Sequence, residues 1–143
     1  MVDATVARAF IERYRDTFES FDADAIGACF AFPCQVTSEA ATVTVMSVPA
    51  VEAWVPQVAR IVGAYRLLGV HHAEILDLQV VPVTPRIAHA LVRWGLRDGN
   101  GATVYDFTAS YALADLGDGL RVTAIAHDET PKLMAAVDRA QGR

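Results

Sequence analysis

The chain has 143 residues, of which 53% are hydrophobic and 20% charged, and its formal net charge is −5. This composition excludes an intrinsically disordered chain and suits one domain over residues 1–143 with a packed interior. Because Lys and Arg do not cluster along the chain, we expect neither a nucleic-acid surface nor a membrane surface.

The N-terminal segment and the cysteines favour a cytoplasmic location. The first apolar run, residues 1–14, includes acids and bases, which is typical of neither a signal peptide nor a transmembrane segment. Cys29 and Cys34 are interpreted as reduced, partly buried thiols, with a disulfide or a metal pair as the alternatives.

Residues 3–20 are predicted to form the first helix. Phe10, Tyr14, Phe18 and Phe21 recur at helical spacing and make an aromatic stripe on one face. Such a stripe is typical of core packing. Tyr14 differs from the others because its hydroxyl, once buried, needs a hydrogen-bond partner, which can be a ligand.

A short helix and a hairpin are predicted next. Asp22 can cap a helix over residues 23–31, and Pro33 is expected to end it. Strands over Cys34–Ser38 and Thr42–Met46 then form a small hairpin.

The second long helix is predicted to begin after Ser47 as its cap and to end before Gly69. Pro56 lies inside this helix and should bend it. The apolar face consists of Trp54, Val58, Ile61, Tyr65 and Leu68.

The next strand is predicted over Val70–Val81, with alternate residues inward. The inward residues are expected to be Leu76, Leu78 and Val80, continued by His72 and Glu74 toward the sheet end. His71 and His72 point to opposite faces, so they cannot easily bind one ion together. His72 and Glu74 would need a third ligand, and we expect no metal site.

Three consecutive long strands are predicted at the C-terminal end: Arg86–Arg97, Thr103–Ala114 and Leu120–Asp128. The intervening turns, Asp98–Gly101 and Asp115–Gly119, are rich in Gly, Asn and Asp. A three-stranded meander is not stable with its apolar face exposed to water. The upstream helices can bury this face, so the sequence predicts an α+β fold. A short helix is expected to begin at Thr130-Pro131.

Alternate residues of each strand in the meander point to opposite faces of the sheet. The apolar face is predicted to consist of Ala88, Ala90, Val92, Trp94, Leu96, Tyr105, Phe107, Ala109, Tyr111 and Leu113. The opposite face carries His89, Leu91, Arg93, Asp106, Thr108 and Ser110. On that face Arg93 and Asp106 can pair across the strands.

The last strand has an ambiguous pattern. Leu120 and Val122 favour even positions inward, whereas Ile125 favours odd ones. A β-bulge near Ala124 reconciles the two, and it would turn His127 inward.

The order of elements resembles the nuclear transport factor 2-like superfamily, and its ketosteroid isomerase and polyketide cyclase-like branch in particular. The resemblance is carried by FIERYRDTFESFDADAIGACFAFP (Phe10–Pro33), LVRWGLRDGNG (Leu91–Gly101) and SYALADLGDGLRVTAIA (Ser110–Ala126). It implies a cone-like curved mixed or antiparallel sheet wrapped around N-terminal helices. It also implies a homodimer, because the outer sheet face often forms the dimer contact in this superfamily.

The resemblance matches the ketosteroid isomerase catalytic set only in part. Tyr14 stands at the position of the oxyanion-stabilising tyrosine, eight residues before Asp22. The position of the carboxylate base is occupied by Ser38, and that of the protonated acid falls at about Ala109. Proton abstraction beside a carbonyl needs both groups, so steroid isomerisation by that mechanism is not expected.

Polyketide cyclases of this type resemble the chain but use a single acid–base group. His127 could serve if the bulge exists, and Asp128 could serve if it does not. The alternative to both roles is an exposed strand end whose acids cap the last helix.

The favoured function is binding of a small apolar or aromatic molecule in an apolar pocket, without a catalytic base or cofactor. The expected ligand-binding residues are Phe18, Trp54, Tyr65, Trp94, Tyr105, Phe107 and Tyr111. One alternative is an isomerase, cyclase or dehydratase with His127 or Asp128 as acid/base and Tyr14 as hydrogen-bond donor. Another is a dimerisation or accessory module. Hydride and phosphoryl transfer are excluded, because no Gly-rich phosphate loop or CxxC pair occurs.

Overall fold

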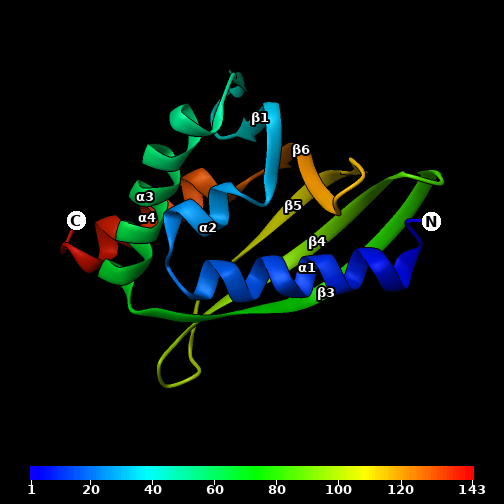
Figure 1. Cartoon of the computed structure of the whole chain (residues 1–143). Coiled ribbons are helices and arrows are strands. Elements are labelled where there is room, and N and C mark those ends of the chain that lie inside the picture. Colours follow the sequence, from blue (N-terminus) through cyan, green and yellow to red (C-terminus); the bar gives the residue numbers. More distant parts are fainter.

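The computed structural model describes residues 1–143 and contains four α-helices and one six-stranded sheet (Figure 1). The helices are α1 (Ala4–Glu19), α2 (Ala23–Gly27), α3 (Val51–Leu68) and α4 (Glu129–Ala140). The strands are β1 (Phe30–Glu39), β2 (Val43–Val48), β3 (Val70–Thr84), β4 (Ile87–Asp98), β5 (Thr103–Asp115) and β6 (Leu120–His127). The predicted α+β class is therefore confirmed.

The sheet is curved and does not close into a barrel. Its strand order is β2-β1-β6-β5-β4-β3, and only the β1–β6 pair is parallel. The long strands β3, β4 and β5 form a sheet along which α1 lies, and α2, α3 and α4 gather near one end of α1 (Figure 1). The side of the sheet that the helices cover is called the concave face below, and the opposite side the convex face.

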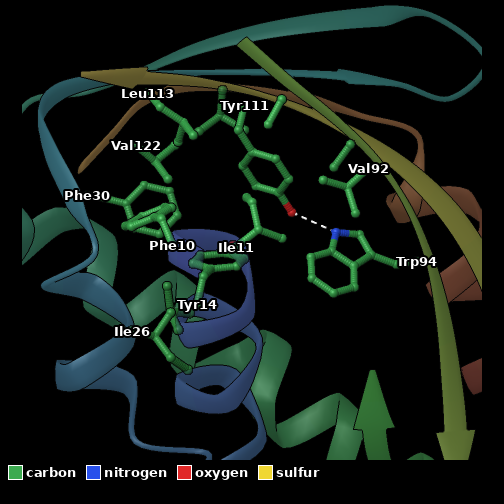
Figure 2. Close-up of a cluster of buried hydrophobic side chains, with 14 of the residues drawn as sticks. Phe10, Ile11, Tyr14, Ile26, Phe30, Val92, Trp94, Tyr111, Leu113 and Val122 are labelled. Atoms are coloured by element: carbon green, nitrogen blue, oxygen red, sulfur yellow. Dashed lines mark hydrogen bonds between the residues drawn. The ribbon is translucent and has the colours of Figure 1, made fainter. Parts of the chain in front are cut away.

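The core lies between the concave face and the helices. The predicted inward residues of β4 and β5 are all buried, which confirms the parity of both strands. Figure 2 shows how Phe10, Ile11 and Tyr14 of α1 pack against Tyr111 and Leu113 of β5. On the convex face, Arg93 pairs with Asp106 as predicted, with 3.3 Å between Nη2 and Oδ2.

Side-chain caps start the first two helices, whereas α3 and α4 begin without a side-chain cap hydrogen bond. Asp3 caps α1 by accepting a hydrogen bond from the Val6 N–H, and Asp22 caps α2 as predicted. The prediction that Ser47 caps α3 is wrong, because Ser47 lies in β2 opposite Gln35, and α3 begins after Ala50 without a side-chain cap.

The segment after α2 turns into a strand earlier than predicted. α2 ends at Gly27 and β1 begins at Phe30, so Pro33 lies inside a strand instead of ending a helix. Pro33 has no backbone N–H and cannot donate a hydrogen bond to a neighbouring strand. The β1–β6 register shifts between Phe30 and Gln35, so the pairing does not require a donor at Pro33. β1 runs ten residues, twice the predicted length of five.

The inward residues of β3 also differ from the prediction. The pairing with β4 shifts between Ile75 and Asp77, so Leu76 is an extra residue on the convex side, beside Gly95. Upstream of this bulge Ile75 packs on the core, whereas His72 and Glu74 are exposed. A bulge reverses which residues of a strand face inward, and the prediction assumed an unbroken two-residue period along β3.

The predicted bulge in β6 is confirmed. Leu113 pairs with Val122, but Ala112 pairs with Ala124, so Thr123 is the extra residue. The strand continues to His127 with odd positions toward the helices. No helix is both long enough and apolar enough to cross a membrane.

Candidate functional site

A cavity of about 110 Å³ lies between the concave face of the sheet and helices α1, α3 and α4. Most of the residues that line it are hydrophobic. Six of the seven predicted ligand-binding residues line it, namely Phe18, Trp54, Tyr65, Trp94, Phe107 and Tyr111. Tyr14 and His127 line it as well, so the fold brings together residues from both halves of the chain.

The polar centre of the cavity is Glu129, the first residue of α4. Its Oε2 accepts hydrogen bonds from the hydroxyl groups of Tyr65 on α3 and Tyr105 on β5, the latter at 2.7 Å. Tyr105 does not itself line the cavity, so its part in the site is to hold this carboxyl group. Three elements thus position one carboxyl group in an otherwise apolar wall.

Burial makes Glu129 reluctant to ionise. Its pKa is raised above the ordinary value because burial disfavours the charged form, and the two tyrosine hydroxyl groups oppose that rise by stabilising the carboxylate. The nearby charge of Asp128 raises the pKa further. No Lys, Arg or His side chain forms an ion pair with Glu129.

His127 lies beside Glu129 and is held as a neutral ring. Its Nδ1 accepts a hydrogen bond from the Glu129 backbone N–H at 3.1 Å, which leaves the ring proton on Nε2. The pKa of His127 is lowered because burial disfavours the imidazolium, with a smaller opposing effect from Asp128. The imidazole therefore offers one donor near the cavity.

Asp128 points away from the cavity. Its Oδ1 accepts a hydrogen bond from the Thr108 N–H at 2.9 Å, and its Oδ2 lies 3.5 Å from Lys132 Nζ. It lines a shallow hollow on the convex side instead. Because the bulge at Thr123 exists, the structure favours the alternative that turns His127 inward over the one that used Asp128.

The two tryptophans differ in how their indole N–H groups are satisfied. Trp94 donates to the Tyr111 hydroxyl at 2.9 Å, as Figure 2 shows. Trp54 is buried against Phe30, with 5.2 Å between ring centroids, and its Nε1 has no partner. Buried polar groups are rarely left unpaired, and Trp54 is among the residues that line the cavity.

Tyr14 occupies the middle of the aromatic wall. Its ring lies 5.3 Å from that of Phe18 and 5.4 Å from that of Tyr111, measured between centroids. Burial raises the pKa of its hydroxyl well above the ordinary value, and Tyr111 adds to the rise. The group is therefore a neutral phenol, which suits a hydrogen-bonding role and excludes a phenolate.

The rim of the cavity carries the charged residues. Glu19 of α1 accepts a hydrogen bond from the Ala73 N–H at 2.8 Å and lies 2.7 Å from His72 Nδ1. Arg15 lies 3.1 Å from Asp16. These groups are engaged with one another, so neither Arg15 nor His72 is paired with Glu129.

The predicted site residues included His127 and Asp128 but not Glu129, the next residue along the chain. One signal could have found it. If the strand direction continues past His127, residue 129 lies on the same face as residue 127 because strand side chains alternate. His127 and Glu129 both line the cavity, although Asp128 between them has a ψ of 22° and is not extended.

Residues 3–130 match a sequence family described as NTF2-like protein (DUF6841). The chain belongs to this family. The predicted nuclear transport factor 2-like fold is thereby confirmed. No curated protein sequence matches the chain.

Solved structures show the same fold at low sequence identity. Aln2 from a Streptomyces species is 14% identical, with a TM-score of 0.69 over 92% of this chain and 94% of that one. An NTF2-like protein with a cystatin-like fold from Novosphingobium aromaticivorans is 15% identical, with a TM-score of 0.68 over 94% and 88%. A domain of unknown function with a cystatin-like fold from Nostoc punctiforme is 14% identical, with a TM-score of 0.64 over 99% and 86%. At these identities the likeness concerns the fold alone.

Proposed function

We propose that this NTF2-like domain binds a small, mostly apolar molecule in the cavity under α1 and α3. The observation that carries the proposal is the mostly hydrophobic cavity of about 110 Å³, one of whose lining residues, Trp54, has a buried indole N–H without an acceptor. An unpaired buried donor costs about 1–3 kcal/mol. A ligand oxygen that accepts from Trp54 would recover this free energy, while the aromatic wall buries the rest of the ligand.

Intrinsic fluorescence tests this proposal directly. The chain has two tryptophans, and both line the cavity. Titration with benzyl alcohol, a neutral single-ring probe with one acceptor oxygen, is expected to change the emission in a saturable way. A linear, non-saturating response would contradict the proposal.

A pair of variants separates the cavity from the surface. Ala73 lines the cavity, so Ala73→Leu should fill part of it and weaken benzyl alcohol binding at least about tenfold. Ala126 is exposed on the neighbouring hollow, so Ala126→Leu should leave the affinity unchanged. Equal effects of the two variants would argue against the cavity as the site.

A second candidate function is acid–base catalysis as an isomerase, cyclase or dehydratase. It is favoured by the neighbouring positions of His127 and Glu129 in one cavity wall, with the neutral Tyr14 hydroxyl as a donor. His127→Ala should abolish such an activity, whereas Asp128→Asn should keep it because Asp128 points away. A pH–rate profile that is unchanged in both variants would exclude this function.

We also propose that two copies of the chain associate through the convex face of the sheet. Leu91 is 42% exposed at the middle of β4, and Ile87 on the same strand is 41% exposed. Leu91→Asp should convert a dimer into a monomer in light scattering, with Leu116→Asp, on an exposed loop, as the control. A monomeric wild-type chain at high concentration would contradict the association.

A cytoplasmic location is the third part of the proposal. Cys29 and Cys34 are both free thiols, which is typical of proteins in reducing compartments. Fractionation of cells that produce the tagged protein checks this, and recovery outside the cytoplasm would contradict it.

A further inference from the structure

We propose that the cavity selects a small organic amine, bound as an ammonium ion that pairs with Glu129 while its apolar part packs on the aromatic wall. This inference rests on the proposed function, since it names the class of molecule that enters the same cavity. It adds a charge requirement that a generic apolar pocket does not have.

The first observation is the free hydrogen-bonding capacity of Glu129. Its Oε2 accepts from Tyr65 and Tyr105, and its Oε1 accepts no hydrogen bond from the protein. Glu129 lines the cavity, so an ammonium N–H can reach the carboxyl group from there. The two phenols fix the carboxyl group in place before the ligand arrives, which limits the entropy lost on binding.

The second observation is the lack of a counter-charge in the protein. The basic side chains nearest the cavity are engaged elsewhere. Arg15 hydrogen-bonds Asp16, His71 lies 3.2 Å from the Gly69 carbonyl, and His127 uses its Nδ1 as an acceptor. Even a partly buried carboxylate is destabilised without a cationic partner, and a ligand cation would supply the missing charge.

The third observation is the arrangement of aromatic rings beside the carboxyl group. Tyr65, which donates to Glu129, lies 6.2 Å from Phe18, and Phe18 lies 5.3 Å from Tyr14. On the sheet side, Tyr105 lies 6.1 Å from Phe107. Aromatic faces and a carboxylate both attract cations, so a cavity lined by these rings and by Glu129 favours an ammonium group over a neutral or anionic one.

The cavity volume limits the size of the amine. About 110 Å³ is enough for several water molecules or for one ring with a short substituent. The aromatic wall suits a flat apolar body. A primary amine attached to a single ring therefore satisfies charge, size and shape together.

The experiment is calorimetric titration of the whole chain with three matched single-ring probes: benzylamine, benzyl alcohol and benzoate. At neutral pH benzylamine is expected to bind at least about tenfold more tightly than benzyl alcohol, because a charge-assisted hydrogen bond replaces a neutral one. Benzoate should bind more weakly than both, because its charge repels Glu129.

Two variants assign the preference to one carboxyl group. Glu129→Gln keeps an acceptor for both tyrosines but removes the charge, so the ratio of benzylamine affinity to benzyl alcohol affinity should fall to about one. Retained benzyl alcohol binding also shows that this variant is folded. Glu39→Gln neutralises an exposed carboxyl group outside the cavity and should leave all three affinities unchanged.

The outcomes separate the two proposals. Equal binding of benzylamine and benzyl alcohol, or tightest binding of benzoate, overturns the amine inference while the cavity remains a binding site. A preference for benzylamine that survives Glu129→Gln also overturns it. Binding of none of the three probes contradicts both the inference and the proposed function.

Discussion

At the scale of single residues, Glu129 and His127 have opposite effects on the pH dependence of stability. The folded-state pKa of Glu129 is raised, so its contribution to stability is present below its unfolded pKa and is lost as pH rises through the folded value. The pKa of His127 is lowered, so its contribution is present above its unfolded pKa and is lost as pH falls through the folded value. A pH profile of the wild type alone therefore mixes two opposing effects.

Glu129→Gln isolates the first effect, because His127 remains in both proteins. The unfolding free energy of the wild type relative to this variant should fall as pH rises above the unfolded-state pKa of a glutamate, which is about 4.3, by about 1.4 kcal/mol for each unit between the two pKa values. Urea unfolding at several pH values measures it. A difference that does not change with pH would show that Glu129 ionises as it does in the unfolded chain.

Tyr111 provides a second prediction at this scale. Tyr111→Phe removes the acceptor of the Trp94 indole N–H, which is buried in the core (Figure 2). We expect a loss of about 1–3 kcal/mol in the free energy of unfolding, because the donor stays buried without a partner. A loss below about 0.5 kcal/mol in urea unfolding would show that the donor finds another acceptor or water.

Sequence reasoning found most of the residues of the candidate site but not its polar centre. The aromatic residues follow from helical and strand periodicity, so they could be placed in one wall. The pairing of Glu129 with Tyr65 and Tyr105 joins residues 64 and 24 positions apart. Such a contact depends on where α4 docks, and no local pattern encodes that.

At the scale of elements, the end of α3 depends on one glycine. Gly69 caps the helix with a φ of 72°, a conformation that L side chains rarely adopt. Gly69→Ala should therefore lower the free energy of unfolding by about 1–2 kcal/mol.

A matched control lies in the same helix. Gly63 is exposed inside α3, and a Cβ added there meets nothing within 4 Å. Gly63→Ala should raise the stability by about 0.5–1 kcal/mol, because alanine favours the helical backbone. Thermal unfolding of both variants checks the pair, and shifts of the same sign would contradict the stated conformations.

Strand predictions succeeded where alternation is regular and failed at some irregularities. β4 and β5 have unbroken alternation, so their faces were predicted correctly. In β6 the conflict between Val122 and Ile125 signalled the bulge. In β3 the apolar run around Leu76 gave no such conflict, and the bulge there was missed. A bulge is visible in the sequence only when it interrupts a clear pattern.

At the scale of the whole molecule, the concave face and the helices share one hydrophobic core. Leu113 of β5 is fully buried in it, whereas Leu116, just beyond the strand, is 57% exposed. Leu113→Ala should cost about 2–5 kcal/mol of unfolding free energy, and Leu116→Ala should change it by less than about 0.5 kcal/mol. Comparable losses of unfolding free energy in the two variants would contradict the burial of Leu113 in the core.

The fold was more accessible to sequence reasoning than the function. Helix, hairpin, helix and meander follow from periodicity and turn residues, which predict an α+β fold. Their order resembles the NTF2-like superfamily, and the family match confirms that resemblance. This fold carries many functions, so chemistry has to be argued from the cavity itself.

The most direct test of the cavity as a binding site is the ¹H–¹⁵N spectrum of the two indole N–H groups during titration with benzylamine. Trp54→Phe assigns the signals, since it leaves only Trp94. We predict a saturable shift of the Trp54 signal and a smaller shift of Trp94, whose N–H already donates to Tyr111. If neither indole signal nor the Glu129 amide signal moves at high probe concentration, the cavity is not a binding site for such molecules.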